Sequence, residues 1–419
     1  MRYTLVILRL NKHFLPYIPI ATLLPSVAFL FSFILSSFPA AANEGVFLFG
    51  NDVQQLSRAG SGVASPRSAY WSYLNPASIV DLKSRVDLSL YNVFPNVESK
   101  PRGLMGNRLD GTLKAGGMFN ILSGGGIYNM ERYGTIGGGL YIPSGTGVEY
   151  DHSRNILTRL FQGNKDRRLT YQHFRLVLSY AYEFPHGFAL GASLHTSLSR
   201  FRSDHITLKF RPTEGDNEWD NALGIGYGVG IYKTWERFAI GASYMSRHYT
   251  QKMHKYKDLL RYSLDTPQII QVGVAWKVIP QVELTADYKF LNWKDIPTYG
   301  NKLLKGGFNW HDQWAVKLGI EWTINEHWRV MAGYAHASTP IDKDHVFLST
   351  LVPVTCEDHI TAGFTYSYNT HHEFHFAFIL GIPKKMEDTG HGDLLSHLGK
   401  DSELTSNGES FAIGYSYKF

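Results

Sequence analysis

Three side chains near the end of the chain have the types and the spacing of metal ligands. His371, Glu373 and His375 lie two residues apart, opposite Phe374 and Phe376, so on an extended strand all three would share one face. Two imidazoles and a carboxylate can together bind a metal ion. A polar strand face has the same pattern, and we favour this second interpretation, so no metal site is predicted.

Motifs of enzymatic catalysis are missing from the sequence. It contains no G-x-S-x-G, no H-E-x-x-H and no G-x-x-x-x-G-K-[ST] pattern. The stretch from Gly224 to Gly230 reads GIGYGVG, which lacks the spacing of a dinucleotide-binding loop. On a strand its glycines would all face one way and form a smooth wall. We therefore predict a protein that is not an enzyme and needs no cofactor.

Composition argues against several classes of protein. The chain has 419 residues, of which 14% are aromatic, a mean hydropathy of −0.19 and a single cysteine, Cys356. A polytopic helical membrane protein would be more hydrophobic, a disordered chain would carry fewer aromatic residues, and a disulfide scaffold needs more cysteines. The formal net charge of +5 is a weak excess without a basic block, which gives nucleic-acid binding little support.

Residues 1–42 have the organisation of a secretory signal peptide. Basic residues at the start precede a long apolar stretch that ends in Ala40-Ala41-Ala42, and this order is typical of an export signal. We predict cleavage after Ala42. An uncleaved membrane anchor is the alternative, although prolines interrupt the apolar stretch.

Beyond residue 42 the chain alternates between apolar and polar or small residues. From Ile270 to Trp276, for example, Ile, Val, Val and Trp interleave with Gln, Gly and Ala. Side chains on a strand point alternately to opposite faces, so each such segment is predicted to be a strand with one apolar face. About fourteen segments of this kind begin near residues 83, 132, 170, 187, 204, 222, 237, 267, 281, 312, 327, 357, 372 and 409.

Alternation also fits a soluble sandwich, but three features favour a transmembrane antiparallel β-barrel. Apolar faces repeatedly end in Tyr or Trp, the opposite faces carry glycine, small polar residues and charges, and short connections alternate with long ones. We therefore predict an all-β barrel over residues 82–419. It would lie as a monomer in the outer membrane of a Gram-negative bacterium, in contact with its lipids and lipopolysaccharide.

The last strand ends in an alternating aromatic pattern. Tyr415, Tyr417 and the final residue, Phe419, would share one face. A terminal aromatic residue of this kind resembles the signal that outer-membrane barrels present to the barrel assembly machinery. A last strand that happens to end in phenylalanine is the alternative.

Residues 43–81 do not alternate. Gly60, Gly62, Pro66 and Pro76 interrupt this segment, yet it carries many apolar and aromatic side chains that need a place to be buried. In a barrel that place would be the lumen, so we predict an N-terminal plug. A cap or tail in the periplasm is the alternative.

The stretch LSRAGSGVA, which contains Gly60 and Gly62, is followed by Asn75-Pro76-Ala77 and resembles the N-terminal hatch of the FadL/TodX (OMPP1) family. Stretches within 137–145, 266–293 and 313–340 are similar to the family in the same order. The resemblance implies a fourteen-stranded barrel with a hatch in its lumen. It also implies passive transport of hydrophobic molecules without a cofactor. Residues 65–73 are basic and aromatic where the family is usually acidic, which leaves the substrate open.

The resemblance implies capture of the substrate in an outer groove, passage to an inner pocket beside the hatch, and lateral release after the hatch shifts. Loops 97–131 and 294–311 are the candidates for the groove because they carry apolar residues, and exposed apolar patches often bind ligands. Packing of these loops on one another explains the same residues equally well. The residues singled out are Leu104, Met105, Phe308 and Trp310.

A fatty-acid carboxylate would need a buried cation. Arg175, Lys289, Lys317 and Arg329 lie on faces predicted to point into the lumen. The interpretation that we favour for each of them is an ion pair with a neighbouring carboxylate, for which the candidates are Glu283, Asp287 and Glu321.

Three hypotheses follow from the sequence. The leading one is an outer-membrane transporter of hydrophobic molecules, with long-chain fatty acids ahead of aromatic and other hydrocarbons. A general porin or structural barrel would lack the hatch. A lipid hydrolase of the outer membrane would need a serine and a histidine on adjacent strands, which the sequence alone does not locate.

Overall fold

The computed structural model describes residues 44–103, 112–150, 167–204, 217–257 and 259–419. The predicted signal peptide (1–42) and the candidate groove residues Leu104 and Met105 lie outside these ranges. Within them, no helix has both the length and the apolar character needed to cross a membrane.

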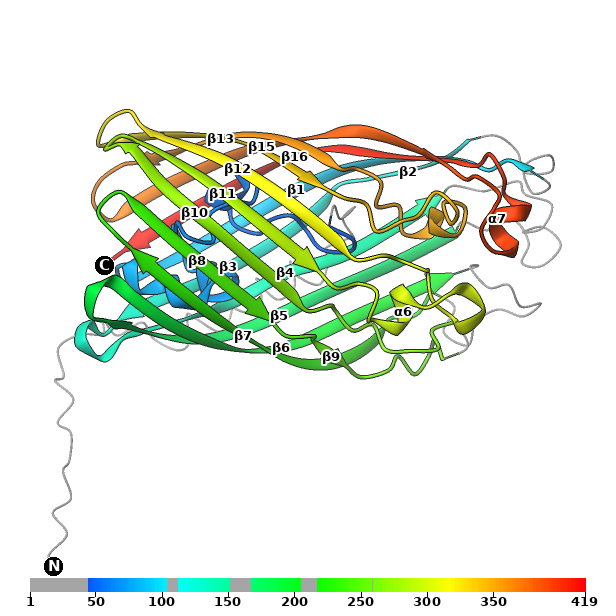
Figure 1. Ribbon diagram of the computed structural model, residues 1–419, viewed down its shortest axis with the longest axis horizontal. Helices are drawn as coiled ribbons and strands as arrows, with labels where there is room; N and C mark the ends of the chain where they lie inside the picture. The colour runs from blue at the N-terminus through cyan, green and yellow to red at the C-terminus, as the bar shows by residue number, and fades with distance from the viewer. Residues whose placement is uncertain (1–43, 104–111, 151–166, 205–216, 258) are drawn as a thin grey trace, which may run out of the picture. The chain divides into compact units, whose positions relative to one another are not determined.

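Fourteen long antiparallel strands form one closed β-barrel (Figure 1). Each long strand pairs with the next, and the last strand pairs with the first along its whole length, so the sheet closes on itself. Two short strands, β2 (Leu113–Gly116) and β9 (Tyr249–Thr250), add to the first and sixth long strands. The long strands are β1 (Arg85–Lys100), β3 (Phe119–Asn129), β4 (Thr135–Tyr150), β5 (Arg167–Phe184), β6 (Phe188–Asp204), β7 (Asp220–Thr234), β8 (Phe238–Met245), β10 (Ile269–Ile279), β11 (Val282–Leu291), β12 (Gln313–Thr323), β13 (Trp328–Ala337), β14 (Asp358–Ser367), β15 (His372–Glu387) and β16 (Glu403–Lys418).

Strand side chains alternate between the outside of the barrel and its interior, as the sequence predicts. In β12 the exposed side chains are apolar, and the buried ones are mostly polar or small. Tryptophans lie at both ends of the exposed row, where a membrane-spanning strand meets the lipid headgroups. The exposed row is Trp314, Val316, Leu318, Ile320 and Trp322, and the buried row is Gln313, Ala315, Lys317, Gly319 and Glu321.

Short turns and long connections lie at opposite ends of the barrel, which confirms the predicted alternation. Residues 185–187, 280–281 and 324–327 form tight turns at what we call the turn end. The connections 292–312 and 338–357 lie at the loop end, where α6 and α7 are also found (Figure 1). The helices at the loop end are α6 (Pro297–Gly300), η4 (Leu303–Lys305), η5 (Leu348–Leu351) and α7 (Leu394–Leu398), and those at the turn end are η2 (Glu131–Tyr133) and η3 (Pro185–Gly187).

The predicted strand count is correct, but one predicted strand does not exist and one strand of the barrel was not predicted. β6 continues to Asp204, so the strand predicted to begin near 204 does not start there. The missing member is β3, which the sequence analysis placed in the loop 97–131. β3 carries three successive glycines, Gly124 to Gly126, so it has no side-chain alternation in its centre. The last strand also begins earlier than predicted, at Glu403.

Residues 44–82, which we call the N-terminal segment, lie inside the barrel (Figure 1). The segment contains three short helices: α2 (Val53–Leu56), α3 (Trp71–Leu74) and η1 (Pro76–Asp81). Its aromatic residues are buried, and Trp71 is fully inaccessible. The Asp52 carboxylate begins α2 by accepting hydrogen bonds from the amides of Gln54 and Gln55.

The seam between the first and last strands is also joined to the N-terminal segment. Asp87 of β1 accepts a hydrogen bond from the amide of Ala69 at 2.7 Å. The same carboxylate forms an ion pair with Arg85 at 2.6 Å and accepts a hydrogen bond from the hydroxyl of Ser416 in β16. One buried side chain therefore links both strands of the seam to the segment that they enclose.

Candidate functional site

The Asn75-Pro76-Ala77 turn is fixed both within the N-terminal segment and against the barrel wall. Asn75 begins η1, where its Oδ1 accepts a hydrogen bond from the amide of Ala77 at 3.2 Å, and proline suits the first helical position. Asn75 Nδ2 donates to the carbonyl oxygens of Val63 at 3.0 Å and of Ile231 in β7 at 3.3 Å. A single side chain thus joins two parts of the segment to the wall.

Glycines in the wall give this turn its room. Gly191 of β6 pairs with Gly230 of β7, and both face the interior. A β-carbon on Gly191 would lie 2.4 Å from the Ala77 nitrogen, and one on Gly230 would lie 2.1 Å from Asn75 Oδ1. The GIGYGVG stretch therefore has the inward glycine face that the sequence predicts. One of these glycines, Gly230, lies directly against the N-terminal segment.

Gly60 and Gly62 lie in backbone conformations that favour glycine, with φ of +77° and +111°. The amides of Gly62 and Val63 both donate to Oδ2 of Asp287 in β11, each at 2.9 Å. Asp287 was a predicted ion-pair partner of the inward cations. Its carboxylate instead holds the backbone of the N-terminal segment.

Arg329, a predicted ligand cation, belongs to a network of ion pairs at the turn end. Its guanidinium lies 3.0 Å from Glu373 and 3.8 Å from Glu321. Arg67 of the N-terminal segment contacts the same Glu321 at 3.1 Å and Glu283 at 2.7 Å. The ion-pair alternative therefore holds for Arg329, with Glu373 as a partner that the sequence analysis did not consider.

A cavity of about 370 Å³ lies within this network. Because charged groups line it, it suits water and ions better than a hydrophobic molecule. Its lining includes Arg67, Arg85, Glu283, Glu321, Arg329 and Lys418.

Lys317 is also paired, and its partner comes from the start of the N-terminal segment. Lys317 Nζ lies 2.6 Å from Glu44 Oε1 and donates to the Phe49 carbonyl oxygen at 3.0 Å. Lys289 Nζ contacts the other oxygen of the same carboxylate. Burial alone would raise the pKa of Glu44, but the two ammonium groups outweigh it and hold this pKa below its ordinary value.

Arg175 of β5 differs from the other predicted cations, because no carboxylate pairs with it among the described residues. Its side chain is buried, with 2% of the residue exposed. Nη2 donates to Thr266 Oγ1 at 3.0 Å and to His173 Nε2 at 3.0 Å, and Nη1 donates to the Tyr73 hydroxyl at 3.2 Å. These partners leave the guanidinium charge without a formal counter-charge.

Serine–histidine pairs, which the sequence analysis did not locate, occur on inward faces. His173 Nδ1 lies 2.8 Å from Ser199 Oγ on the adjacent β6, and His248 Nε2 lies 2.6 Å from Ser197 Oγ. Because Arg175 donates to His173 Nε2, the ring proton of His173 lies on Nδ1. In that tautomer Nδ1 donates to Ser199 and does not act as a base toward its hydroxyl proton.

The three residues with metal-ligand spacing do not come together. His371 lies in the turn before β15, where its ring contacts the Lys418 carbonyl oxygen at 2.8 Å. Glu373 pairs with Arg329, and His375 Nδ1 lies 2.8 Å from Thr365 Oγ1. The preferred interpretation, a polar strand face, describes Glu373 and His375, whereas His371 lies outside the strand.

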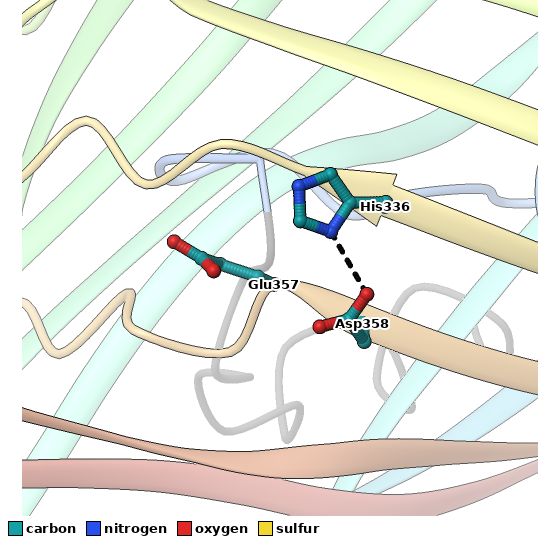
Figure 2. Close-up of side chains that lie close together, drawn as sticks. All are labelled: His336, Glu357 and Asp358. Carbon is teal, nitrogen blue, oxygen red and sulfur yellow. Dashed lines mark hydrogen bonds and ion pairs between the residues drawn. The ribbon is translucent and has the colours of Figure 1, made fainter.

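A different trio brings its ligand atoms close together within the described ranges. Figure 2 shows His336 near the end of β13 with Asp358, the first residue of β14, and Glu357, which directly precedes it. His336 Nδ1 lies 2.8 Å from Asp358 Oδ1, and Glu357 pairs with Lys384 at 2.9 Å. Asp358 and Glu357 therefore each already have a side-chain partner, His336 and Lys384.

Trp310, a predicted groove residue, is buried, with 1% of the residue exposed. Its ring packs against Tyr299 and Trp293, with centroids 4.9 and 5.2 Å apart, and Phe308 lies half-buried at the edge of this aromatic cluster. Phe47 of the N-terminal segment reaches the same cluster through Trp293. Connection 292–312 thus directs these rings inward, and Leu304 is its exposed apolar residue.

A second cavity, of about 220 Å³, lies toward the loop end between β1–β3 and β4–β6. Apolar residues dominate its lining, and some come from the predicted groove region 97–131. They are Pro95, Val97, Ala115, Met118, Phe119 and Val148.

The pairing of the wall strands changes beside this cavity. The pairing of β3 with β4 begins at Gly124 and Leu140 and continues toward the turn end. From Tyr141 to Tyr150, toward the loop end, β4 therefore pairs with β5 alone among the described strands. Residues of the N-terminal segment bond to part of this unpaired edge of β4, which we call the free edge. Leu48 donates its amide to the Pro143 carbonyl oxygen at 2.9 Å, and the Gly145 amide donates to the Val46 carbonyl oxygen at 2.8 Å.

Comparison with known proteins links this architecture to a family. A protein-family model described as outer membrane protein transport protein (OMPP1/FadL/TodX) matches residues 33–419. No curated protein sequence matches the chain.

Solved structures share the fold. The Pseudomonas putida toluene transporter TodX is 13% identical, with 89% of this chain and 99% of TodX covered and a TM-score of 0.68. A Pseudomonas aeruginosa FadL homologue is 14% identical, with 92% and 100% covered and a TM-score of 0.66. The Ralstonia pickettii toluene transporter TbuX is 16% identical, with 89% and 99% covered and a TM-score of 0.66.

Proposed function

Because the chain belongs to the OMPP1/FadL/TodX family of outer-membrane transport proteins for hydrophobic compounds, we propose that it carries long-chain fatty acids by passive diffusion. Its location is the outer membrane of a Gram-negative bacterium. The similar structures include toluene transporters as well as a FadL homologue. The choice of ligand therefore has to come from this chain's own side chains.

Arg175 is the observation that carries the choice. Removing a charge from water without a counter-charge is costly, and a guanidinium forms strong charge-assisted hydrogen bonds to a carboxylate. A fatty acid would supply that carboxylate, whereas toluene has no charged group. The Tyr73 hydroxyl, which accepts from Arg175, belongs to the N-terminal segment, so a head group bound here would touch the hatch directly.

The route is proposed to begin at the apolar cavity and to end at the side of the barrel. The cavity near Phe119 and Val148 suits an alkyl chain. The free edge of β4 near Pro143 is covered by residues 46–48, which supports residues 43–81 acting as a hatch. The charged network at the turn end argues against an axial exit for a hydrophobic molecule.

Uptake by a strain that lacks this protein, complemented with variants, tests the proposal. Labelled oleate and labelled toluene are the two substrates. We expect Arg175→Met to reduce oleate uptake strongly and Arg175→Lys to retain part of it, with toluene uptake unchanged. Arg132→Met, at an exposed arginine of the turn end, is the control.

The possible outcomes separate the alternatives. Normal oleate uptake by Arg175→Met would overturn the assignment to fatty acids. A deletion strain that takes up toluene poorly but oleate normally would favour aromatic hydrocarbons. A deletion strain without a defect for either substrate would remove the transport hypothesis.

A further inference from the structure

The outer surface of the barrel wall changes from apolar to charged near the loop end of β6 and β7. Leu198 of β6 pairs with Leu223 of β7, and both side chains are exposed on the outside of the barrel. Two residues further toward the loop end, Arg200 pairs with Asn221 on the same face. The end of the outward apolar band marks the level at which the lipid hydrocarbon ends. Arg200 therefore lies at the height of the lipid headgroups.

This height belongs to the outer leaflet of the membrane. β6 begins directly after the tight turn 185–187 and ends at Asp204, so Arg200 lies near its loop end. In outer-membrane barrels the short turns face the periplasm and the long loops face the outside of the cell. The outer leaflet there consists of lipopolysaccharide, whose lipid A anchor carries phosphate groups at the headgroup level.

Trp219, the residue before β7, contacts two arginines of β6. The Cζ atom of Arg200 lies 4.4 Å from the centroid of the indole ring, and the Cζ atom of Arg202 lies 4.6 Å from it. The face of an indole ring attracts a guanidinium group. A stacked guanidinium is held in one plane while its N–H groups stay available to an anion. Trp219 thus pre-organises two cations on the outside of the wall.

Arg200 has no anion of its own. Its Nη1 is shielded from water and has no hydrogen-bond partner, and no carboxylate pairs with its guanidinium among the described residues. Arg168 on the neighbouring β5 pairs with Glu149 and donates to Asn217 at 3.3 Å. Because buried donors are normally satisfied, the guanidinium of Arg200 points to an acceptor that comes from outside the protein.

Other cations near the loop end have carboxylate partners within the chain. Lys100 Nζ lies 2.8 Å from Glu98, and Lys385 Nζ lies 3.1 Å from Glu403. The position of Arg200 is therefore not explained by a general excess of positive charge at this end of the barrel.

A lipid phosphate suits these arginines better than the carboxylate of a transported fatty acid. A phosphate monoester carries close to two negative charges and three acceptor oxygens, and the planar guanidinium matches its geometry. The apolar pair Leu198 and Leu223 lies on the membrane side of the arginines, where the acyl chains of the same lipid would pack. Arg175, by contrast, is buried on the inward face of β5, so the wall separates it from Arg200.

We propose that Arg200, Arg202 and Trp219 form a binding site for a lipid A phosphate of lipopolysaccharide on the outside of the barrel. The arginines bind the phosphate, and the acyl chains lie along the apolar rows of β6 and β7. A lipid bound in this way fixes the height of these two strands in the outer leaflet. The inference does not depend on which hydrophobic molecule is transported.

Binding of lipid A to the purified full-length protein in detergent tests the site. The probes are lipid A with both phosphates and dephosphorylated lipid A, and native mass spectrometry counts the bound molecules. We expect the double variant Arg200→Gln/Arg202→Gln to bind lipid A more weakly, on the order of tenfold or more, because it loses hydrogen bonds from charged groups. The variant Arg200→Lys/Arg202→Lys keeps both charges and should retain part of the affinity.

Arg132→Gln is the matched control. The Cζ atom of Arg132 lies 4.6 Å from the ring centroid of Tyr133, so it is also a stacked arginine, but it lies at the turn end. We expect it to bind lipid A as tightly as wild type. Gel mobility with and without heating checks that each variant is folded.

The melting temperature gives a second measurement. A ligand that binds the folded protein raises it, so lipid A should stabilise wild type and Arg132→Gln more than the double variant. High salt should reduce this difference, because it screens the charges of the arginines and the phosphates.

Four results would overturn the proposal. The first is equal binding of lipid A by wild type and the double variant, and the second is equal binding of dephosphorylated lipid A by wild type. The third is competition by inorganic phosphate as strong as that by lipid A, which would assign the site to a free anion. The fourth is a double variant that keeps lipid A but loses oleate uptake, which would assign the arginines to the substrate. A wild type that does not transport oleate leaves this proposal standing, because lipid A binding is measured directly.

Discussion

Gly230 in β7 lies directly beneath Asn75, so close that a β-carbon at Gly230 would be 2.1 Å from Asn75 Oδ1. Asn75 can therefore occupy this position only because Gly230 has no side chain. Gly191 on the neighbouring strand approaches Ala77 in the same way, so the whole Asn75-Pro76-Ala77 turn depends on the absence of side chains beneath it.

We predict that Gly230→Ala displaces this turn. The added methyl group cannot be accommodated without moving Asn75, and overpacking of this kind costs roughly 1–3 kcal/mol. The displaced segment should let more ions pass, measured as single-channel conductance in planar bilayers. Gly228→Ala is the control, because its β-carbon would meet the side chain of Ser193 and not the segment. Equal conductance of both variants would show that the turn is not seated by Gly230.

Deletion of residues 43–81 tests the hatch as a whole. We expect ion conductance to rise well above that of the intact protein, since the deletion removes the residues that fill the lumen. Gel mobility with and without heating checks that the shortened barrel is folded. An unchanged conductance from a folded barrel would mean that these residues do not block the lumen.

The docking of α2 is predicted to depend on pH through Asp52. Burial is the largest effect on Asp52, and together with the negative charge of Asp87 it raises the pKa of this residue from its ordinary 3.8 to about 6. Hydrogen bonds from Ser68 and Gln55 and the charge of Arg85 lower this pKa, but by less. The protonated acid is therefore favoured in the docked state. Its stabilisation is complete below pH 3.8 and is lost as the pH rises through about 6, a difference of about 3 kcal/mol.

Hydrogen exchange measures this effect. After correction for intrinsic rates, the amides of residues 53–57 should be better protected at pH 5 than at pH 7. Asp52→Asn keeps a capping oxygen without the charge and should remove the difference. A pH response that persists in Asp52→Asn would assign it to another group.

Removal of Phe419 is predicted to impair assembly more than stability. Phe419 is 69% exposed, so little packing is lost when it is deleted. If Tyr415, Tyr417 and Phe419 are an assembly signal, the amount of folded protein in the outer membrane should fall several-fold while the melting of the purified barrel stays the same. Tyr368→Ala, at an aromatic residue 63% exposed in a turn, is the control. Normal membrane levels without Phe419 would contradict the signal.

Local patterns explain what could be predicted from the sequence. Alternation is a property of neighbouring residues, so β12 and its inward Lys317 are readable without a structure. β3 was missed because Gly124, Gly125 and Gly126 have no side chains to alternate. The Asn75-Pro76-Ala77 motif could be found, but the glycines beneath it could not be assigned to it.

Partners far apart in the chain could not be predicted. Glu44 and Lys289 are separated by 245 residues, and no spacing rule connects a residue at the start of the N-terminal segment to a strand of the wall. The same is true of Arg175, because the lack of a carboxylate beside it among the described residues depends on what the other strands bring near it.

The contacts of Asp87 have a consequence for the order of folding. Its carboxylate accepts hydrogen bonds from Ala69, in the N-terminal segment, and from Ser416, in the last strand of the barrel. Residues far apart in the sequence must therefore meet before this cluster is complete, which is a contact of high order and hence slow to form. Closure of the barrel and docking of the segment then become a single late, cooperative event. A chain that closed its seam without the segment in place would leave Asp87 without the hydrogen bond from the Ala69 amide, which disfavours empty barrels as stable products.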